Sequence, residues 1–506
     1  MWKDKLLRQV FLALLVLLAG LVLVGAQAGW AADPVSGPQP GLQPQPLLVQ
    51  DYRSVELSFK NGEVPLAGSL VLPEGAGPFP AVVMLHGSEP DERAIFWRTG
   101  DAEAFLKAGI AVFIYDKRGV GASGGNWRTA GLDDLAADGA AAVELVRARP
   151  EVFPNRVGVF GVSQGGTLAP MVALRSGNVA FVINVSGSGL PLANQELWSA
   201  GNELRRRGFS PAAVADTMQV MHLAFSARPL LRSGLLPLGD LYLWFVNIDP
   251  YQDPAALWRQ VAAPMYVAYG AQDNVMPARE SAAVAQAVFA ERHNPFDRLV
   301  VVPGAGHGVR LSSGQWAPGH IEQMTGWVLA VTQGHAPEQA TVVQAVDPGE
   351  NRWFGLGASP TPWYATFTVQ VGLILFFAMS FGLGLLLALN PRVTLALPGV
   401  GRLPRMALLT GSAVNLLLLA GLLVVLGFLA FADPNGTGPQ VPYAGLLSAL
   451  SGVSAVLAAV LAYFSARGRR SAAWSRAVRT VYTLAAAASV GYLIFLLYWR
   501  LLGPPL

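Results

Sequence analysis

Four apolar stretches near the C-terminal end constrain this chain more than any other feature. They occupy residues 366–389, 408–432, 446–464 and 481–498 of 506, and each is close to the ~20 residues that cross a bilayer as a helix. They contain no Asp, Glu, Lys, Arg or His, whereas proton relays and ion-coupled transporters usually need an ionisable group inside the membrane. We therefore expect residues 366–506 to form an all-α transmembrane region that anchors the protein in the lipid bilayer or binds a membrane partner.

Polar residues inside these stretches have a simple interpretation. Asn415 and the series Ser448, Ser451 and Ser454 interrupt the apolar pattern. Small and amide side chains commonly mediate packing between membrane helices, so we interpret them as helix contacts in preference to a pore.

The placement of arginine predicts how the four helices are oriented. The connection between the second and third stretches contains no basic residue. Cytoplasmic loops carry an excess of Lys and Arg, which predicts that residues 33–365 and the C-terminus lie on the extracytoplasmic side. The basic residues of the other two connections are Arg392, Arg402 and Arg405, and Arg467, Arg469, Arg470, Arg476 and Arg479.

The first 32 residues give the same orientation independently. Three basic residues (Lys3, Lys5 and Arg8) precede an apolar run at 10–25, and alanines follow at 26, 28, 31 and 32. This pattern is typical of a secretory signal peptide, with an uncleaved signal anchor as the alternative. Either one places the following domain outside the cytoplasm.

The charge of the chain is divided between its two parts. Residues 33–364 hold 23 basic and 30 acidic residues, whereas residues 365–506 hold nine arginines and one aspartate. The net charge of +3 therefore comes from the apolar tail and does not indicate a nucleic-acid partner. The chain has no cysteine, which excludes disulfides, a thiolate nucleophile and Cys-ligated zinc.

Residues 51–333 alternate short apolar runs with helix-like stretches, between a linker at 33–50 and a linker at 334–365. Near-continuous β-branched runs are typical of buried parallel strands, and stretches 132–149 and 278–292 are long enough for crossover helices. The pattern predicts an α/β layer fold whose site lies at the carboxyl ends of the strands. The expected strands are 55–59, 68–72, 81–85, 111–115, 157–160, 181–185, 265–269 and 299–302.

A serine after one of these strands is the candidate nucleophile. Ser163 lies in Gly161-Val162-Ser163-Gln164-Gly165-Gly166, between the strand 157–160 and a helix-like run. In a sharp strand-turn-helix, the small residues Gly161 and Gly165 leave room for the strained backbone that projects the serine. Ser123 also lies in a Gly-x-Ser-x-Gly match, but no strand precedes it directly, so we interpret it as a loop residue.

A serine hydroxyl needs a base, and the base needs an orienting acid. His307 follows the strand 299–302, and Asp273 follows the strand 265–269. A surface-loop histidine and a turn-capping aspartate are the structural alternatives. The chain order Ser163, Asp273, His307 is the order found in α/β-hydrolases, so we expect these three to be catalytic.

Acyl transfer also needs N–H donors for the developing oxyanion. We expect them to be the backbone N–H groups of Gln164, which follows the nucleophile, and Ser88, which follows the strand 81–85. His86 in the same loop is interpreted as structural. No P-loop and no His-Glu-x-x-His motif is present, so we predict neither a cofactor nor a metal.

Residues 51–333 resemble an α/β-hydrolase of the group that contains prolyl oligopeptidase-like, serine aminopeptidase-like and dienelactone hydrolase-like enzymes. The resemblance implies a helical cap inserted at about 190–263. Within it, we interpret the aromatic and leucine-rich residues 230–248 as cap core, with an acyl pocket or a membrane contact as alternatives. Arg205, Arg206 and Arg207 are expected on a solvated helix face, with an anion site as the alternative. The motifs that carry the resemblance are His86-Gly87-Ser88, the run from Tyr115 to Ser123, the Ser163 motif, Asp273 and Gly306-His307.

The sequence therefore predicts a membrane-anchored, extracytoplasmic serine hydrolase. Its expected substrates are small-molecule carboxylic esters, then amides or peptides, with thioesters as a further option. Since a fold does not fix function, the alternatives are a non-catalytic receptor or scaffold on the same fold and a transporter with an attached domain.

Overall fold

A computed structural model describes residues 52–206, 211–233, 244–335, 363–431 and 444–498. The predicted signal, the first linker and most of the second lie outside these residues. The chain divides into two compact units. The first combines Asp33–Glu203 with Gly239–Ser359, and the second combines Leu204–Leu238 with Pro360–Leu506.

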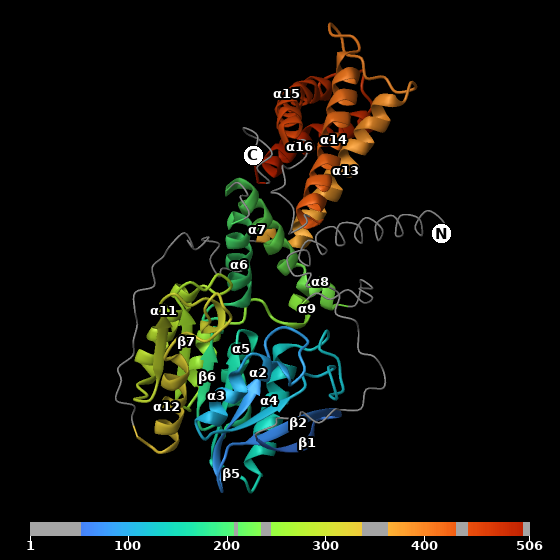
Figure 1. Cartoon of the computed structure of the whole chain (residues 1–506). Helices are drawn as coiled ribbons and strands as arrows, with labels where there is room; N and C mark the ends of the chain where they lie inside the picture. The colour runs from blue at the N-terminus through green and yellow to red at the C-terminus, as the bar shows by residue number, and fades with distance from the viewer. Residues whose placement is uncertain (1–51, 207–210, 234–243, 336–362, 432–443, 499–506) are drawn as a thin grey trace. The chain divides into compact units, whose positions relative to one another are not determined.

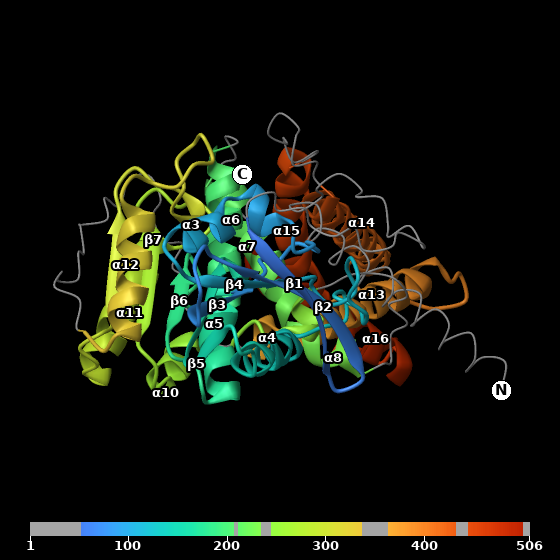
Figure 2. The ribbon, with the colours of Figure 1, turned by 60° about the horizontal axis from the view of Figure 1, so that its bottom comes forward.

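The first unit is built on one eight-stranded mixed sheet in the order β1-β2-β4-β3-β5-β6-β7-β8 (Figure 2). Strands β3 to β8 run parallel, as expected, whereas β1 and β2 form an antiparallel hairpin and β2 is antiparallel to β4. All eight predicted strands are present, with ends that differ by up to five residues. Their bounds are β1 (Arg53–Asn61), β2 (Val64–Leu72), β3 (Phe79–Leu85), β4 (Ala111–Tyr115), β5 (Val152–Val162), β6 (Val182–Val185), β7 (Met265–Gly270) and β8 (Arg298–Val302).

Helices cover both faces of this sheet and enclose two apolar cores (Figure 1). Successive side chains of a strand point to opposite faces, so β3 places Val83 and Leu85 in one core and Val82 and Met84 in the other. Helices α4 (Leu132–Arg147), α5 (Gln164–Ser176) and α11 (Ala278–Arg292) pack on the first face; α2 (Ile95–Arg98), α3 (Asp101–Lys107) and α12 (His320–Thr332) pack on the second.

Five described helices lie between β6 and β7, where the resemblance implies a cap. The structure divides them, because the residues of α7 and α8 cluster with the C-terminal helices and those of α9 and α10 with the sheet. The resemblance implied a cap at about 190–263 within the domain 51–333. The five are α6 (Leu192–Arg206), α7 (Pro211–Ser226), α8 (Arg228–Arg232), α9 (Trp244–Asn247) and α10 (Pro254–Gln260).

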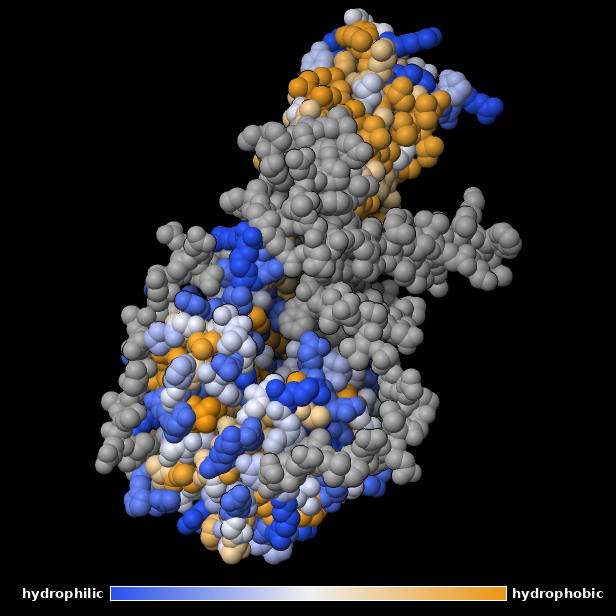
Figure 3. All heavy atoms as spheres, in the orientation of Figure 1, coloured by the Kyte–Doolittle hydropathy of each residue, from blue (hydrophilic) through white to orange (hydrophobic). Residues whose placement is uncertain are grey.

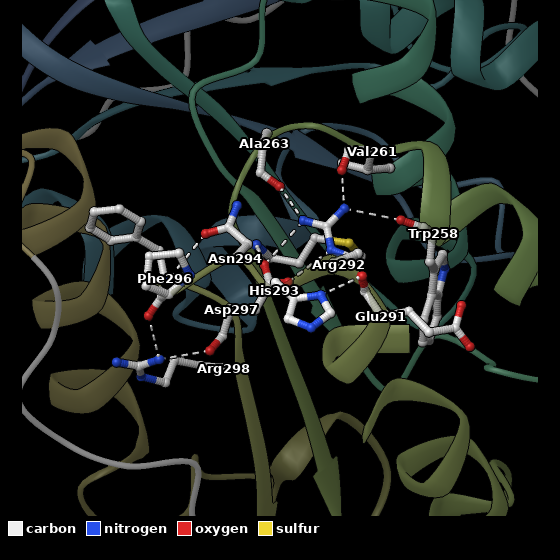
Figure 4. A network of polar contacts seen from close by, with 12 residues as sticks. Trp258, Val261, Ala263, Glu291, Arg292, His293, Asn294, Phe296, Asp297 and Arg298 are labelled. Carbon is white, nitrogen blue, oxygen red and sulfur yellow. Dashed lines mark hydrogen bonds and ion pairs between the residues drawn. The ribbon is translucent and has the colours of Figure 1, made fainter. Parts of the chain in front are cut away.

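A buried arginine fixes the chain where the inserted helices end and β7 begins (Figure 4). The guanidinium of Arg292 donates to the backbone oxygens of Trp258 (3.1 Å), Val261 and Ala263 (2.8 Å). It also binds both carboxylate oxygens of Asp297, at 2.8 and 3.1 Å, so that all five of its donors are used. Asp297 in turn accepts the N–H of Met265, the first residue of β7, at 2.9 Å.

The predicted apolar helices are present in the second unit. They are α13 (Phe367–Leu389), α14 (Leu403–Phe431), α15 (Ala444–Arg469) and α16 (Arg476–Tyr498), and each contains a stretch long and apolar enough to cross a membrane. In Figure 3, hydrophobic side chains cover most of their visible surface, and hydrophilic ones gather at the end that carries the α13–α14 connection.

Three of these helices, α14, α15 and α16, extend beyond the predicted apolar stretches and take in flanking arginines. Helix α14 begins at Leu403 instead of residue 408, so Arg405 lies in its first turn. Its guanidinium donates to the backbone oxygens of Ala388 (2.8 Å), Asn390 (3.0 Å) and Val393. Because the last carbonyls of a helix lack helical partners, this contact caps the end of α13.

The polar residues inside the helices contact one another. Asn415 donates to Ser489 Oγ at 3.1 Å and accepts from Ser454 Oγ at 2.5 Å, and all three side chains are buried. These contacts join α14, α15 and α16, in keeping with the predicted packing role.

Candidate active site

Ser163 occupies a strained turn between β5 and α5. Its φ of 59° and ψ of −121° lie outside the ordinary regions for a residue with a side chain. Two glycines make the turn sterically feasible: a Cβ on Gly161 would lie 2.1 Å from the carbonyl carbon of Gly165, and one on Gly165 would lie 2.3 Å from the oxygen of Leu85. This local geometry resembles a nucleophile elbow.

His307 and Asp273 contact each other at the ends of neighbouring strands. His307 Nδ1 lies 3.0 Å from Asp273 Oδ2 and 3.2 Å from Oδ1. The residue Asp273 is 2% exposed, and its carboxylate accepts the backbone N–H groups of Val275 (2.9 Å) and Met276 (2.8 Å). These bonds hold the carboxylate so that it accepts the Nδ1 proton, which leaves Nε2 of the imidazole as an acceptor.

The His307 loop lies beside the residue that precedes the nucleophile. The N–H of Gly308 donates to Ser186 Oγ at 3.0 Å, and a Cβ on Gly308 would lie 3.2 Å from the side chain of Val162. No hydrogen bond joins the Ser163 hydroxyl to His307 among the described contacts. Such bonds are often long in free hydrolases and tighten when substrate binds.

Ser186 is a positioning residue that the sequence analysis missed. Its φ is 51°, its N–H donates to the oxygen of Ala268 at 2.8 Å, and its hydroxyl holds the His307 loop. Ser186 directly follows the predicted strand 181–185. Functional groups of such sheets lie at the carboxyl ends of the strands, so its position in the sequence could have identified it.

A buried lysine joins the two predicted oxyanion donors, Ser88 in the loop after β3 and Gln164 at the start of α5. Lys117 Nζ donates to the backbone oxygens of Gly87 (2.8 Å), Ser88 (3.0 Å) and Glu89 (3.1 Å) and to Gln164 Oε1 (3.3 Å). Lys117 thus connects the Ser88 loop to the residue after the nucleophile. The sequence analysis gave it no role, although it follows the strand 111–115 by two residues.

Burial changes the protonation of Lys117. The side chain is almost completely enclosed, and this desolvation lowers the pKa of Lys117 to about 8, an effect opposed by the charges of Asp91 and Glu89. An ammonium has three N–H donors and a neutral amine has two. Loss of the proton therefore weakens the support of the Ser88 loop.

Ser123, the alternative serine, is locked into the fold. It is 7% exposed, its hydroxyl donates to the oxygen of Asp116 at 2.7 Å, and it accepts the N–H of Ala67 at 3.1 Å. Both hydrogen-bonding roles of this hydroxyl are thus filled by backbone groups. The loop interpretation agrees with this arrangement.

His86 is packed among aromatic rings. Its ring centroid lies 4.8 Å from that of Phe96 and 5.2 Å from that of Tyr115. Burial, with the nearby charge of Lys117, lowers the pKa of His86 to about 3, so the ring is neutral at physiological pH.

Within the described residues, no three His, Asp or Glu side chains form a group that could hold a metal ion.

Comparisons with known proteins point to hydrolases. The profile of the X-Pro dipeptidyl-peptidases (S15 family) matches residues 61–230, a range that contains Ser163 and Lys117 and ends before Asp273 and His307. Esterase EstD of Thermotoga maritima is 27% identical over 237 residues, 44% of this chain and 54% of that protein. Thiohydrolase aneE of Aspergillus aculeatus is 35% identical over 136 residues, 26% of this chain and 41% of that protein.

The chain thus spans about half the length of these curated relatives. Among solved structures, an esterase of Pyrococcus furiosus is 19% identical to this chain, with a TM-score of 0.40. The match covers 60% of this chain and 98% of the esterase chain. Over its matched residues the chain is similar to α/β-hydrolases, among S15-type peptidases and esterases, and it combines this part with four long apolar helices at residues 367–498.

Proposed function

We propose that this protein is a membrane-anchored serine hydrolase that cleaves carboxylic esters through an acyl-enzyme on Ser163. The observation that carries the proposal is the strained turn at Ser163 on the same sheet edge as the hydrogen-bonded pair His307 and Asp273. A strained backbone persists only where the surrounding structure holds it in place. At Ser163 the turn is possible because Gly161 and Gly165 have no side chains to clash with the neighbouring backbone.

In the acylation step, Ser163 Oγ attacks the ester carbonyl while His307 Nε2 takes the hydroxyl proton. The negative charge that develops on the carbonyl oxygen is stabilised by the backbone N–H groups of Gln164 and Ser88. Asp273 stabilises the imidazolium without taking its proton. The leaving alcohol then receives that proton from His307, and the acyl group remains on Ser163.

Deacylation repeats these roles with water. His307 removes a proton from a water molecule, which attacks the acyl carbonyl, and the same N–H groups stabilise the second oxyanion. The proton returns to Ser163 Oγ as the carboxylic acid leaves. The cycle needs no metal or cofactor.

Esters are the first choice because an alkoxide leaves more readily than an amide anion. The relatives include an esterase and a thiohydrolase, whereas the matched profile describes a peptidase family. Parallel assays with p-nitrophenyl esters, an acyl thioester and an X-Pro p-nitroanilide rank these classes. Turnover of the anilide alone would make the protein a peptidase and contradict the ester assignment.

A fluorophosphonate probe, which reacts with activated serines, tests the nucleophile. We expect the protein to be labelled and Ser163→Ala to lose all labelling, together with about 10⁶-fold in kcat. Ser123→Ala is the matched control and should keep its labelling, because that hydroxyl serves only the fold. Absence of labelling in the unaltered, folded protein would favour a non-catalytic receptor or scaffold.

The arginine distribution supports an extracytoplasmic position for the hydrolase domain. Eight of the nine arginines of residues 365–506 lie in the α13–α14 and α15–α16 connections or in the helix ends beside them, and this bias marks the cytoplasmic side of membrane proteins. With both connections inside, residues 52–335 and the end of α16 lie outside.

A further inference from the structure

The second unit contains a segment that interrupts the hydrolase sequence. Residues 204–238 include α7 and α8, and they cluster with the four apolar helices although more than 120 residues separate them in the chain. Helix α7 packs against α13 and α14. Its inner face contains Val214, Met218 and Phe225, all completely or nearly completely buried.

Two hydrogen bonds locate α7 along these helices. Ser226 Oγ accepts the N–H of Phe367, the first residue of α13, at 2.7 Å. Gln219 Nε2 donates to the backbone oxygen of Tyr498, the last residue of α16, at 3.2 Å. In a bundle of four spans, the first helix begins at the same face where the fourth ends. Helix α7 is therefore attached at one end of the bundle, opposite the arginine-rich connections.

Aromatic residues mark that end as a membrane interface. Trp363 is 75% exposed and Tyr364 is 49% exposed, immediately before α13. The rings of Tyr364 and Tyr498 meet edge to face at 6.3 Å. Trp and Tyr concentrate at the headgroup level of bilayers, so α7 lies at that level.

The charge of the segment differs from that of the rest of the hydrolase sequence. Residues 204–238 contain five arginines and one aspartate, a net charge of +4, which leaves 18 basic and 29 acidic residues elsewhere in 33–364. Arg205, Arg206 and Arg232 are exposed. Arginines beside an apolar helix are typical of segments that lie in the membrane interface and attract anionic headgroups.

We propose that α7 and α8, together with the end of α6 that carries Arg205 and Arg206, form an interfacial element that binds the anionic phospholipid surface of the leaflet facing the hydrolase domain. This inference depends on the proposed membrane anchoring and extends it, because the inserted segment becomes a second contact with the lipid.

A lipid-facing probe tests this element in the full chain. The protein contains no cysteine, so Pro229→Cys, at an exposed position of α8, carries a single environment-sensitive NBD label. Ser58→Cys, exposed on β1, is the matched control. Both are reconstituted in vesicles of phosphatidylcholine, with or without phosphatidylglycerol, that contain a headgroup nitroxide quencher.

We expect anionic vesicles to increase quenching at residue 229 by about twofold and to leave residue 58 unchanged. Added salt should reverse the increase, because the Debye length falls from about 30 Å at 0.01 M to about 10 Å at 0.1 M. The triple change Arg205→Gln, Arg206→Gln and Arg232→Gln should abolish it.

Equal quenching at residue 229 in neutral and anionic vesicles would overturn the interfacial element while leaving the anchor intact. Extraction of the protein from vesicles by alkaline carbonate would contradict the anchor itself, and the interfacial element with it. A response to phosphatidylglycerol that persists in the arginine triple variant would also overturn the proposal, because the charge would not be its cause.

Discussion

Lys117 gives a test at the scale of single residues, since its ammonium holds the loop that carries the Ser88 N–H. We expect Lys117→Met to lower kcat by about 10- to 100-fold. This loss is no larger than the loss caused by removing an oxyanion donor itself. In the unaltered protein kcat should decline as the pH rises through about 8, where Lys117 loses its proton. The variant should lack this decline in a pH–rate profile.

The free energy of unfolding should rise over the same pH range in which kcat declines. The folded protein releases the Lys117 proton near pH 8, whereas the unfolded chain keeps it up to the ordinary value of 10.5. The unfolded state therefore binds more protons between these values, and the free energy of unfolding rises with pH relative to Lys117→Met. Lys107→Met, an exposed control, should alter neither profile. If kcat and the free energy of unfolding instead changed with pH in the same direction, Lys117 would have only a structural role.

The Arg292 network gives a test at the scale of elements, because it fixes the start of β7, the strand that leads to Asp273. The Arg292 and Asp297 side chains are 6% and 3% exposed. Removing one partner of a buried ion pair costs about 3–5 kcal/mol, so Arg292→Met should lower the thermal midpoint by several degrees, followed by tryptophan fluorescence in detergent. Arg259→Met, which breaks the exposed pair with Glu291, should cause little change. Equal midpoints for the two variants would mean that the network does not stabilise the fold.

The strands were predictable because burial on both faces leaves continuous apolar runs, as in 111–115. Their ends were less predictable: β5 begins at Val152 rather than residue 157, because Val152 pairs with Phe79 across a register shift that interrupts the apolar pattern. Helix α14 likewise begins before its apolar stretch, since Arg405 caps the end of α13. Hydropathy reports burial, whereas the ends of helices and strands depend on backbone partners.

The orientation of the protein can be tested at the scale of the whole molecule. Because the chain lacks cysteine, single cysteines at Ser58 in β1 and at Ala472 between α15 and α16 report on the two sides. We expect a membrane-impermeant maleimide to label Ser58→Cys in intact spheroplasts. Ala472→Cys should react only after permeabilisation, because the positive-inside rule places that loop in the cytoplasm. The reverse labelling pattern would contradict the proposed topology.

The sequence by itself determined the sheet, the four apolar helices and the residues that follow each strand, because periodicity and local motifs are properties of neighbouring residues. The contact of His307 with Asp273, the role of Lys117 and the packing of α7 against α13 were decided by tertiary structure. The acceptors of Lys117 are mostly backbone oxygens, which no sequence pattern marks. The bond from Phe367 to Ser226 joins positions 141 residues apart, and only the folded chain brings such groups within hydrogen-bonding distance.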